Sequence, residues 1–321
     1  MDIISLYYFR ELSKDLSMTK TANRLFISQQ TLSYHIQILE KEYGTNFFNR
    51  TPKMTLTDAG RQLLTTAHSI LEEEGNFRNI VNDITKNESG LLRIGAGSQR
   101  GLYFLPNVLT DFGKRYPKVK LQLTTNISVH LQEQVLNDDL DLAITNIAEK
   151  HPLLTYEFAH YYPIYICIAD KLLKHYYGKE AAKIKNTSKN GINIASIQQL
   201  PFINMGINNG IDIIMSKAFE EIGVTPNIYL TSRHSHLNAQ LCARGLAACF
   251  MNHFTLLNEL QSLSKGINIF PLLLDGKPTR QMLNIIRHKK NYLPMYTKYF
   301  IKLLKADFQK ISDETICRVV K

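Results

Sequence analysis

The sequence has little cysteine and no long apolar run, and each shortage excludes a class of protein. No apolar stretch reaches the roughly 18 residues that a membrane-spanning helix needs. The four cysteines form no C-x-x-C pair and have no histidine cluster beside them, so we expect no zinc site. We expect buried thiols in a reducing compartment, with a redox pair of Cys242 and Cys249 as the alternative.

The N-terminal stretch Met1–Arg10 lacks a basic segment followed by an apolar core. We therefore expect no secretory signal and a cytoplasmic protein. The length of 321 residues predicts two or three domains. The hydrophobic fraction of 44% and the charged fraction of 21% are typical of a folded soluble protein.

The formal net charge of +10 suggests a nucleic-acid partner, but its distribution does not locate a binding site. Residues 1–87 contain ten Lys or Arg and ten Asp or Glu, so the basic excess lies downstream. Much of this excess follows Asp275, and a solvated basic surface explains it. DNA binding must therefore be judged from the residue pattern.

The first 56 residues carry the pattern of three short helices. Apolar residues recur at three- and four-residue steps between Leu6 and Leu16, which predicts an amphipathic first helix. Ser17 and Ser28 are N-cap candidates for a second helix over about 18–26 and a third over about 29–43, which ends at Gly44. These two helices are expected to bury Ala22 and Leu25, and Leu32, Ile36, Leu39 and Tyr43.

The opposite face of the third helix carries neutral hydrogen-bonding side chains, whereas a helix built only for solubility usually carries Lys and Glu. Glutamine can pair bidentately with adenine, and a helix N-terminus favours a phosphate. A short helix, a tight turn and a longer polar-faced helix predict a helix-turn-helix. The turn 50–53, between Phe47-Phe48 and 54–56, predicts a β-wing whose cations reach the DNA backbone or minor groove. The DNA-binding candidates are Ser28, Gln29, Gln30, Thr31, Ser33, Tyr34, His35, Gln37, Arg50 and Lys53.

This segment resembles the N-terminal signature of LysR-type transcriptional regulators. The resemblance is carried, without gaps over about 60 residues, by 17–25, 27–33, 47–50 and 56–60. The family often has a basic residue after Leu32-Ser33, where this chain has Tyr34-His35. The resemblance implies a winged helix-turn-helix that reads DNA, and the departure bears on base preference. A helical bundle without a DNA role is the alternative.

A long helix is predicted from Thr57, an N-cap candidate, to about Asn87. Its seam alternates steps of four and three, which is typical of heptads: Leu63, Ala67, Ile70, Glu74, Phe77, Val81 and Ile84. The resemblance implies that this helix pairs two subunits, giving a homodimer or homotetramer and a partly palindromic operator. The alternative is an amphipathic helix that lies on its own domain.

From Leu91 onward, strands alternate with helices. Strands over 91–96, 119–125 and 140–145 with helices over 101–116 and 128–136 predict a parallel sheet with right-handed crossovers. A second set of elements is expected over 161–169, 201–203, 210–222, 227–231, 236–243 and 246–251. Return strands over 267–274 and 282–287 and a helix over 296–304 then give two α/β lobes. Residues 91–305 resemble LysR-type effector domains, which look like periplasmic binding proteins.

Ligands of open parallel sheets bind beyond the carboxyl ends of the strands. The helices after Gln99 and after Asn208 are expected to aim their N-termini into this cleft, which favours an anion or carboxylate. Each candidate taken alone fits a capped helix or a polar turn equally well. The effector-binding candidates are Ser98, Gln99, Arg100, Asn126, Thr145, Asn146, Phe202, Ile203, Asn204 and His234, with Arg233 and His236 near a strand end.

Two rival functions fit the sequence less well. The segment 95–101 follows a strand and is glycine-rich, as in a dinucleotide loop, but its third glycine is one residue late. The second strand also lacks the acidic residue that would hold a ribose, which disfavours an NAD-dependent enzyme. A solute-binding protein would need an export signal and would not carry residues 1–87.

We therefore predict a DNA-binding domain over 1–56, a linker helix over 57–88, an effector domain over 89–305 and a tail over 306–321. Lobe I is expected over about 89–160 and 268–305, and lobe II over about 161–267. Double-stranded DNA is the expected partner, with RNA polymerase as a further candidate. We predict no catalytic residue, metal, cofactor or membrane partner.

Overall fold

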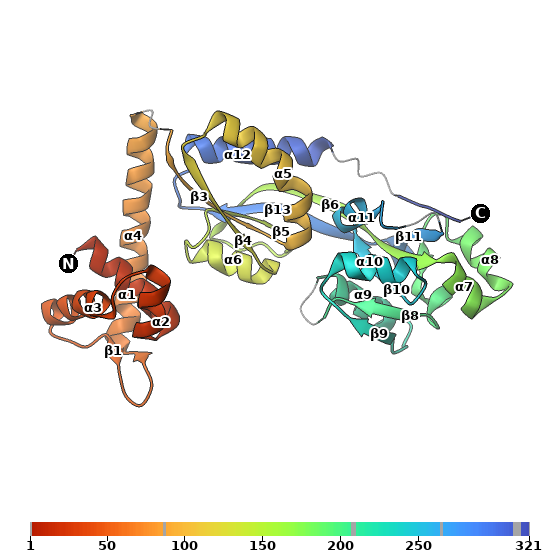
Figure 1. Ribbon diagram of the computed structural model, residues 1–321, viewed down its shortest axis with the longest axis horizontal. Coiled ribbons are helices and arrows are strands. Elements are labelled where there is room, and N and C mark those ends of the chain that lie inside the picture. The colour runs from red at the N-terminus through yellow and green to blue at the C-terminus, as the bar shows by residue number, and fades with distance from the viewer. Residues whose placement is uncertain (1, 86–87, 207–209, 264–265, 311–315, 321) are drawn as a thin grey trace. The chain divides into compact units, whose positions relative to one another are not determined.

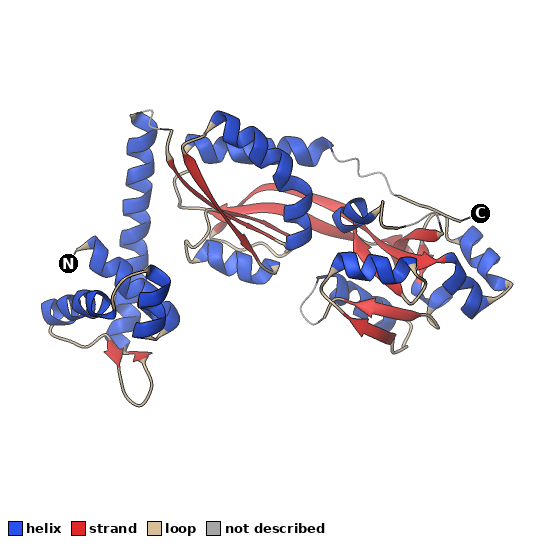
Figure 2. Ribbon diagram, viewed as in Figure 1, coloured by secondary structure: helices blue, strands red, loops and turns tan. Residues whose placement is uncertain are grey.

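The computed structural model describes residues 2–85, 88–206, 210–263, 266–310 and 316–320. The chain divides into two compact units, residues 1–88 with 291–294 and residues 89–290 with 295–321 (Figure 1). The first unit is mainly helical, and the second combines helices with strands (Figure 2). No described helix combines the length and the apolar character needed to cross a membrane.

Three helices form the core of the first unit, namely α1 (Ile3–Asp15), α2 (Met18–Leu25) and α3 (Gln29–Tyr43). Helices α2 and α3 begin, and α3 ends, where the sequence predicts them. Ser17 accepts the backbone N–H of Lys20, and Ser28 accepts that of Thr31, so both serines are N-caps. Gly44 ends α3 in the left-handed region, with φ 65°. The helices enclose Leu6, Phe9, Leu12, Ala22, Leu32, Ile36, Leu39, Phe47 and Phe48.

The predicted burial of Tyr43 is wrong. Its side chain is half-exposed, and its ring meets the edge of Phe47 at 5.9 Å between centroids. Tyr43 belongs to the last turn of α3, where Phe47 and Phe48 already fill the space beside Phe9. Helical spacing identified the correct face, but it gave no information on where the core ends along the helix.

The wing and the long helix follow directly. Strands β1 (Phe48–Asn49) and β2 (Thr55–Leu56) pair antiparallel, as predicted. Thr57 then caps α4 (Asp58–Ile84) by accepting the N–H of Gly60 at 2.9 Å. The helix ends at Ile84, short of the predicted Asn87, which lies outside the described residues.

The second unit contains a long sheet whose strands follow the order β4-β3-β5-β13-β6-β10-β8-β9. These strands are β3 (Gly90–Ala96), β4 (Val119–Thr125), β5 (Leu142–Thr145), β6 (Leu154–Ala169), β8 (Pro201–Asn204), β9 (Asn227–Thr231), β10 (Ala248–Asn252) and β13 (Arg280–His288). Off this path lie β7 (Ile192–Asn193), β11 (Ile267–Leu274) and β12 (Lys277–Pro278).

Strand β6 joins two lobes. Its first part, 154–163, pairs antiparallel with β13, and its second part, 164–169, pairs with β10 and β11. Lobe I therefore contains β3, β4, β5 and β13, with β3 parallel to both β4 and β5. Lobe II contains β8, β9, β10 and β11, with β8 parallel to both β9 and β10. The parallel pairing expected for the first set of strands is confirmed in lobe I, and lobe II contains parallel pairs as well.

Helices cover both lobes. In lobe I, α5 (Ser98–Arg115) packs along α12 (Met295–Lys310), and α6 (Ser128–Leu136) covers the other face of the sheet (Figure 1). The helices of lobe II are α7 (Asp170–Tyr177), α8 (Glu180–Thr187), α9 (Gly210–Glu220), α10 (Ser235–Ala243) and α11 (His253–Glu259), with a 3₁₀ turn at Ile194–Ile197. The second part of β6 is buried throughout, and it forms the centre of the lobe II core.

Two segments without readable function in the sequence are part of the fold. The polar insert near 183–193 contributes the end of α8 and strand β7. The tail returns to lobe II, where Arg318 forms an antiparallel bridge with Ile269. The buried Lys185 donates to the carbonyl oxygen of Val320 and to Asp170, each at 2.8 Å. A buried ammonium group needs such partners because it is shielded from water.

The cysteines are free thiols. Cys167, Cys242 and Cys249 are buried in lobe II, whereas Cys317 is exposed, contrary to the expectation of four buried thiols. The Sγ of Cys242 donates to the carbonyl oxygen of Cys167 at 3.1 Å. Hydrogen bonds with Cys167 and Cys242, together with burial, raise the pKa of the Cys249 thiol, which keeps it protonated. Among the described residues, no cluster of His, Cys, Asp or Glu is arranged to hold a metal ion.

Candidate functional site

The face of α3 opposite the core is exposed and polar. Gln29, Gln30, Thr31 and Gln37 are exposed, and Ser33 is half-buried. Tyr34 is 62% exposed on the same helix. The Ser28 hydroxyl lies 2.8 Å from Oγ1 of Thr31, so the N-cap residue also stabilises the first turn of α3 through a side-chain hydrogen bond. The candidates on α3 therefore lie at or near its N-terminal half, where backbone N–H groups are also available.

His35 differs from the other candidates because it contacts α1. Its Nδ1 lies 2.8 Å from the Ser5 hydroxyl, and its ring packs 4.8 Å from the ring of Tyr8. The side chain is half-buried. His35 thus holds α3 against α1, and only the remaining edge of its ring is available for a ligand.

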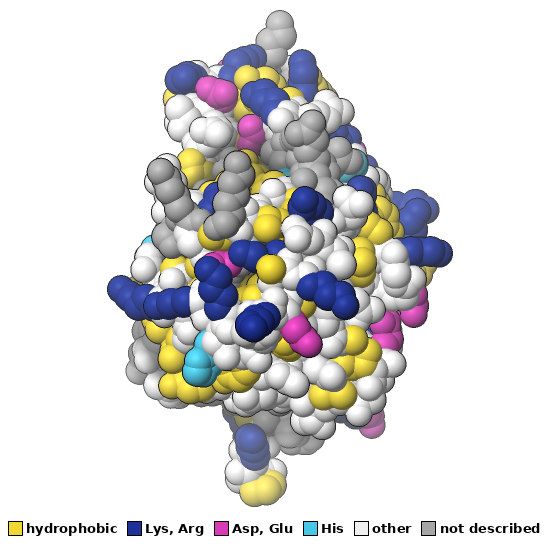
Figure 3. Space-filling model, turned by 90° about the vertical axis from the view of Figure 1, so that its right-hand side faces the viewer, with side chains coloured by type: hydrophobic (Ala, Val, Ile, Leu, Met, Phe, Trp, Pro, Cys, Tyr) yellow, Lys and Arg dark blue, Asp and Glu magenta, His cyan; other side chains and the backbone are white. Residues whose placement is uncertain are grey.

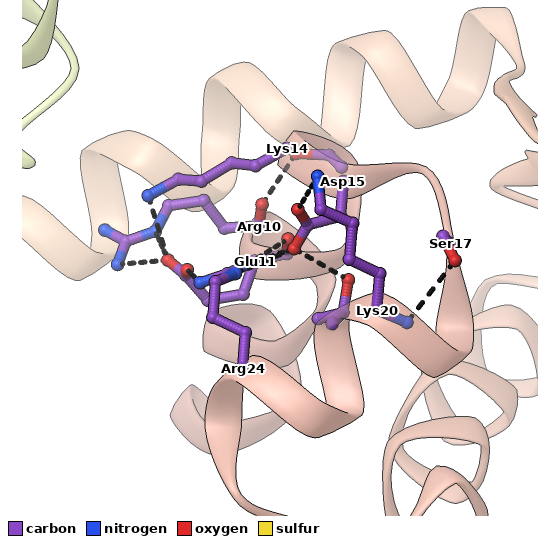
Figure 4. Close-up of polar contacts among 9 residues, drawn as sticks. Arg10, Glu11, Lys14, Asp15, Ser17, Lys20 and Arg24 are labelled. Carbon is purple, nitrogen blue, oxygen red and sulfur yellow. Dashed lines mark hydrogen bonds and ion pairs between the residues drawn. The ribbon is translucent and has the colours of Figure 1, made fainter.

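Several cations of the first unit are used inside it. Arg24 binds Glu11 and Asp15 of α1, each at 2.6 Å, and Lys20 binds Asp15 at 3.0 Å (Figure 4). Burial alone would raise the pKa of Glu11, but hydrogen bonds and charges from Arg24 and Lys14 hold that pKa below its ordinary value. These pairs join α1 to α2 (Figure 4).

The wing contributes one paired and one unpaired cation. Nη2 of Arg50 donates to Oε2 of Glu40 on α3 at 2.9 Å, which ties the wing to that helix. Lys53 is exposed at the tip of the wing and forms no ion pair with the described residues. Lys53 is therefore the wing cation that can reach a phosphate without giving up an ion pair.

The basic excess of the downstream chain lies on the surface of the second unit. Lys and Arg side chains are spread over the end of lobe II that faces the viewer in Figure 3, with few Asp or Glu among them. Helix α7 carries the exposed Lys174, helix α8 carries the exposed Lys183, and the exposed Lys179 lies between them.

A cleft of about 740 Å³ lies between the two lobes. This volume falls within the roughly 300–1,000 Å³ of small-molecule sites. Lobe I contributes the residues that follow its strands and open α5 and α6, and lobe II contributes one face of α9. The polar and charged lining residues are Ser98, Gln99, Arg100, Thr125, Asn126, Ser128, Asn146, Tyr161, Lys217, Arg233, Ser235, Asn252, Thr255, Arg280 and Gln281.

Half of the predicted effector residues line this cleft, namely Ser98, Gln99, Arg100, Asn126 and Asn146. The other half do not, namely Thr145, Phe202, Ile203, Asn204 and His234. Thr145 is buried and donates to Asn284, while Phe202 and Ile203 belong to the lobe II core. Strand β8 lies between β9 and β10, so the interpretation of its apolar residues as cleft residues is wrong.

Arg100 is the most unusual group of the lobe I wall. Its Nη2 donates to the Ser128 hydroxyl at 3.0 Å, while its Nε is buried without a hydrogen-bond partner. No described carboxylate pairs with it, and burial lowers the pKa of Arg100 to about 10. A Cβ at Gly97 would lie 2.7 Å from Nη2, so the guanidinium lies directly over that glycine.

Two helix N-termini open beside Arg100. Neither α5, which begins after Gly97, nor α6, which begins after Ile127, has a side chain that caps it. Their first backbone N–H groups and their dipoles therefore remain available for a ligand. The sequence predicted an N-terminus of this kind at α5 but did not identify the one at α6.

The lobe II wall contains residues that the sequence analysis missed. Gly210, Ile213, Ile214 and Lys217 occupy one face of α9. The spacing of these residues by three and four positions was visible in the sequence. It did not indicate that this face of the helix adjoins the cleft. The predicted helix start after Asn208 falls on residues outside the described part of the chain.

Asp212 is buried on α9, and the charge of Arg233, which lines the cleft, acts on it. Burial raises the pKa of Asp212, although the N–H groups of Met205 and Gly206 and the charge of Arg233 oppose the change. Among the described residues that line the cleft, four are cations and none is Asp or Glu.

Comparison with known proteins assigns the chain to a family. The family model for the LysR substrate binding domain matches residues 85–309, and the model for the bacterial regulatory helix-turn-helix protein, lysR family, matches residues 3–61. The chain belongs to the LysR family of transcriptional regulators. It is therefore a DNA-binding regulator with an effector-binding domain, and not an enzyme.

Relatives of this LysR regulator cover most of its length. The HTH-type regulator YcgK of Bacillus subtilis is 23% identical over 321 residues, which cover 98% of this chain and 97% of YcgK. AlsR of the same organism is 27% identical over 254 residues, covering 78% of this chain and 80% of AlsR.

Solved structures share the fold. A full-length OxyR variant from Pseudomonas aeruginosa has a TM-score of 0.67 at 19% identity. The match covers 98% of this chain and 96% of the OxyR chain. Full-length CbnR in complex with its target DNA has a TM-score of 0.55 at 18% identity. The match covers 96% of this chain and 100% of CbnR.

Proposed function

We propose that this LysR regulator binds a partly palindromic operator as a homodimer or homotetramer in the cytoplasm, under the control of a small anion. The cleft residue Arg100 carries the anion part of the proposal. It is an arginine with a buried, unpartnered nitrogen, and no carboxylate of the described residues pairs with it. Buried cations without a partner are costly, and an anionic ligand removes that cost.

Helix α4 supplies a surface for pairing two subunits. Its first half buries Leu63 and Ala67 in the first unit, while Phe77 is 64% exposed and Ile84 is 74% exposed on its second half. The neighbouring side of the helix is covered by Tyr292, which binds Asn76 and Asp83 at 2.8 Å each. An exposed apolar stripe with heptad spacing favours a second copy of the same helix.

The polar face of α3 supplies the base contacts. Gln29, Gln30, Ser33 and Gln37 offer donors and acceptors suited to base edges in the major groove. Lys53 of the wing and the N-terminus of α3 offer phosphate contacts, which position the helix without reading sequence. In a symmetric dimer the two copies of α3 would read two half-sites.

The anion controls DNA binding through the lobes. An effector held by Arg100 and the N-termini of α5 and α6 would draw lobe II closed over it, which changes how subunits pack. That change would alter DNA bending or a contact with RNA polymerase. The effector can shift this balance only through a difference in its affinity for the open and closed states.

Genomic footprinting of the bound sites tests the regulator assignment and suggests the effector through the neighbouring genes. Metabolites of those genes are then titrated against operator binding by the full-length protein. We expect Arg100→Gln to abolish the response while leaving binding without effector intact. Lys114→Gln, an exposed cation on the same helix, is the matched control. A full response in Arg100→Gln would place the pocket elsewhere, and the lack of any footprint would refute the regulator assignment.

A further inference from the structure

The cleft has two ends that differ in their chemistry. At the inner end, a Cβ on Gly210 would lie 2.8 Å from Nδ2 of Asn146 and 2.7 Å from Nε2 of Gln281. The backbone N–H of Asn146 also donates to the Ser128 hydroxyl, which accepts from Arg100. The inner end therefore gathers one arginine, one hydroxyl and two amides at the start of α9.

The outer end carries a second cation. Lys217 lies seven residues after Gly210 on the cleft face of α9, which places it about 10 Å further along the helix axis. Its side chain is exposed and forms no ion pair with any described residue. Lys217 is therefore an available cation at a fixed distance from the inner end.

The wall between the two ends is apolar. Ile213 and Ile214 lie on α9 between Gly210 and Lys217, and Met205 and Met282 line the cleft as well. Two further cations are less available, because the charge of Arg233 acts on the buried Asp212 and Arg280 donates to the carbonyl oxygen of Tyr161. Along α9 the cleft is therefore lined first by polar side chains of neighbouring elements, then by isoleucines and finally by a lysine.

We propose that the effector is an elongated dianion, of which an α,ω-dicarboxylate is the simplest class. One carboxylate occupies the inner end beside Arg100, the aliphatic chain lies along Ile213 and Ile214, and the second carboxylate pairs with Lys217. This inference rests on the proposed function, because it specifies the anion that the same cleft binds.

A dianion also explains why binding would close the lobes. The inner carboxylate is held mainly by lobe I, since Arg100, Ser128 and Asn146 all belong to it. The outer carboxylate is held by Lys217 of lobe II. A dianion therefore ties the lobes together, whereas a monoanion of the same length gains nothing from Lys217 and favours closure less.

Isothermal titration of the full-length protein with matched acids tests this inference. Adipate and suberate are compared with hexanoate and octanoate, which have the same chain lengths and one carboxylate fewer. We expect each diacid to bind more tightly than its monoacid, by up to roughly fivefold, as an ion pair with an exposed lysine implies. Lys217→Gln should remove this preference. Lys183→Gln, an exposed lysine on α8, is the matched control and should preserve it.

The outcomes separate the two proposals. Equal affinities for diacid and monoacid, or a preference that survives in Lys217→Gln, would overturn the dianion. If Arg100→Gln weakens all four acids in that case, the anionic effector itself remains supported. If none of the acids binds, the dicarboxylate class is refuted, and the operator response of Arg100→Gln still decides whether an anion acts in the cleft.

Discussion

Replacing Arg24 by alanine should destabilise the first unit by about 2 kcal/mol. Arg24 binds Glu11 and Asp15 at 2.6 Å each, and Glu11 is only 5% exposed. Removing one partner of a buried ion pair costs about 3–5 kcal/mol. The cost is smaller here because the Arg24 side chain is 38% exposed and Glu11 keeps Lys14 at 3.0 Å and Arg10 at 3.1 Å.

Native-state hydrogen exchange of the full-length protein measures this effect without unfolding the second unit. A loss of about 2 kcal/mol corresponds to roughly 30-fold faster exchange of the α1 and α2 amides. Lys20→Ala is the control, because Lys20 is 70% exposed and its pair with Asp15 is worth about 0–1 kcal/mol. Equal protection in Arg24→Ala and the unmodified protein at pH 7 would refute the reasoning.

The effect of Arg24 should also depend on pH. Although burial opposes the change, hydrogen bonds from Arg24 and from Lys14 or Lys20 lower the pKa values of Glu11 and Asp15 in the folded state. A carboxyl with a lowered folded pKa stabilises the fold above its unfolded pKa, which is about 4.3 for Glu and 3.9 for Asp. That stability is lost as pH falls through the folded pKa. The difference between Arg24→Ala and the unmodified protein should therefore be full at pH 7 and shrink below about pH 4.

Three further changes test the DNA and pairing surfaces. Gln30→Ala should reduce discrimination among operators by about 1–3 kcal/mol, measured by competition between operator variants. Unchanged preference would remove Gln30 from the readout. Lys53→Gln should lower the slope of log affinity against log salt by about 0.9 for each phosphate that the wing no longer neutralises, and an unchanged slope would show that the wing does not bind phosphate. Phe77→Glu should dissociate the subunits in sedimentation experiments, whereas an intact oligomer would place the pairing surface elsewhere.

The parts of the fold that depend on local chemistry could be predicted from the sequence. Ser17, Ser28 and Thr57 cap helices as expected, because a side-chain oxygen satisfies N–H groups two or three residues ahead whatever the tertiary context. The apolar spacing of Leu32, Ile36 and Leu39 likewise identified the buried face of α3.

The errors concern features that depend on distant residues. Phe202 and Ile203 were placed in the cleft because they end a strand, but β8 is covered by neighbours that come later in the chain. Strand β6 begins at Leu154 and not at Tyr161, because its first part is defined by pairing with β13, more than 100 residues away. Lys217 was not predicted as a cleft residue, because the sequence does not distinguish a helical surface lysine beside a cleft from one elsewhere.

The use of cations inside the first unit has a consequence for how DNA is read. Of the basic residues on α2, α3 and the wing, Lys20, Arg24 and Arg50 already hold carboxylates. Only Lys41 and Lys53 are free of ion pairs among the described residues of this stretch. Each subunit would then neutralise few phosphate charges, so the affinity for non-specific DNA should be modest. That affinity should also rise strongly when two subunits pair, because a dimer neutralises twice as many phosphates. Under that constraint, the neutral face of α3 must supply most of the difference between an operator and other DNA, which is why the Gln30 experiment is the most direct test of recognition.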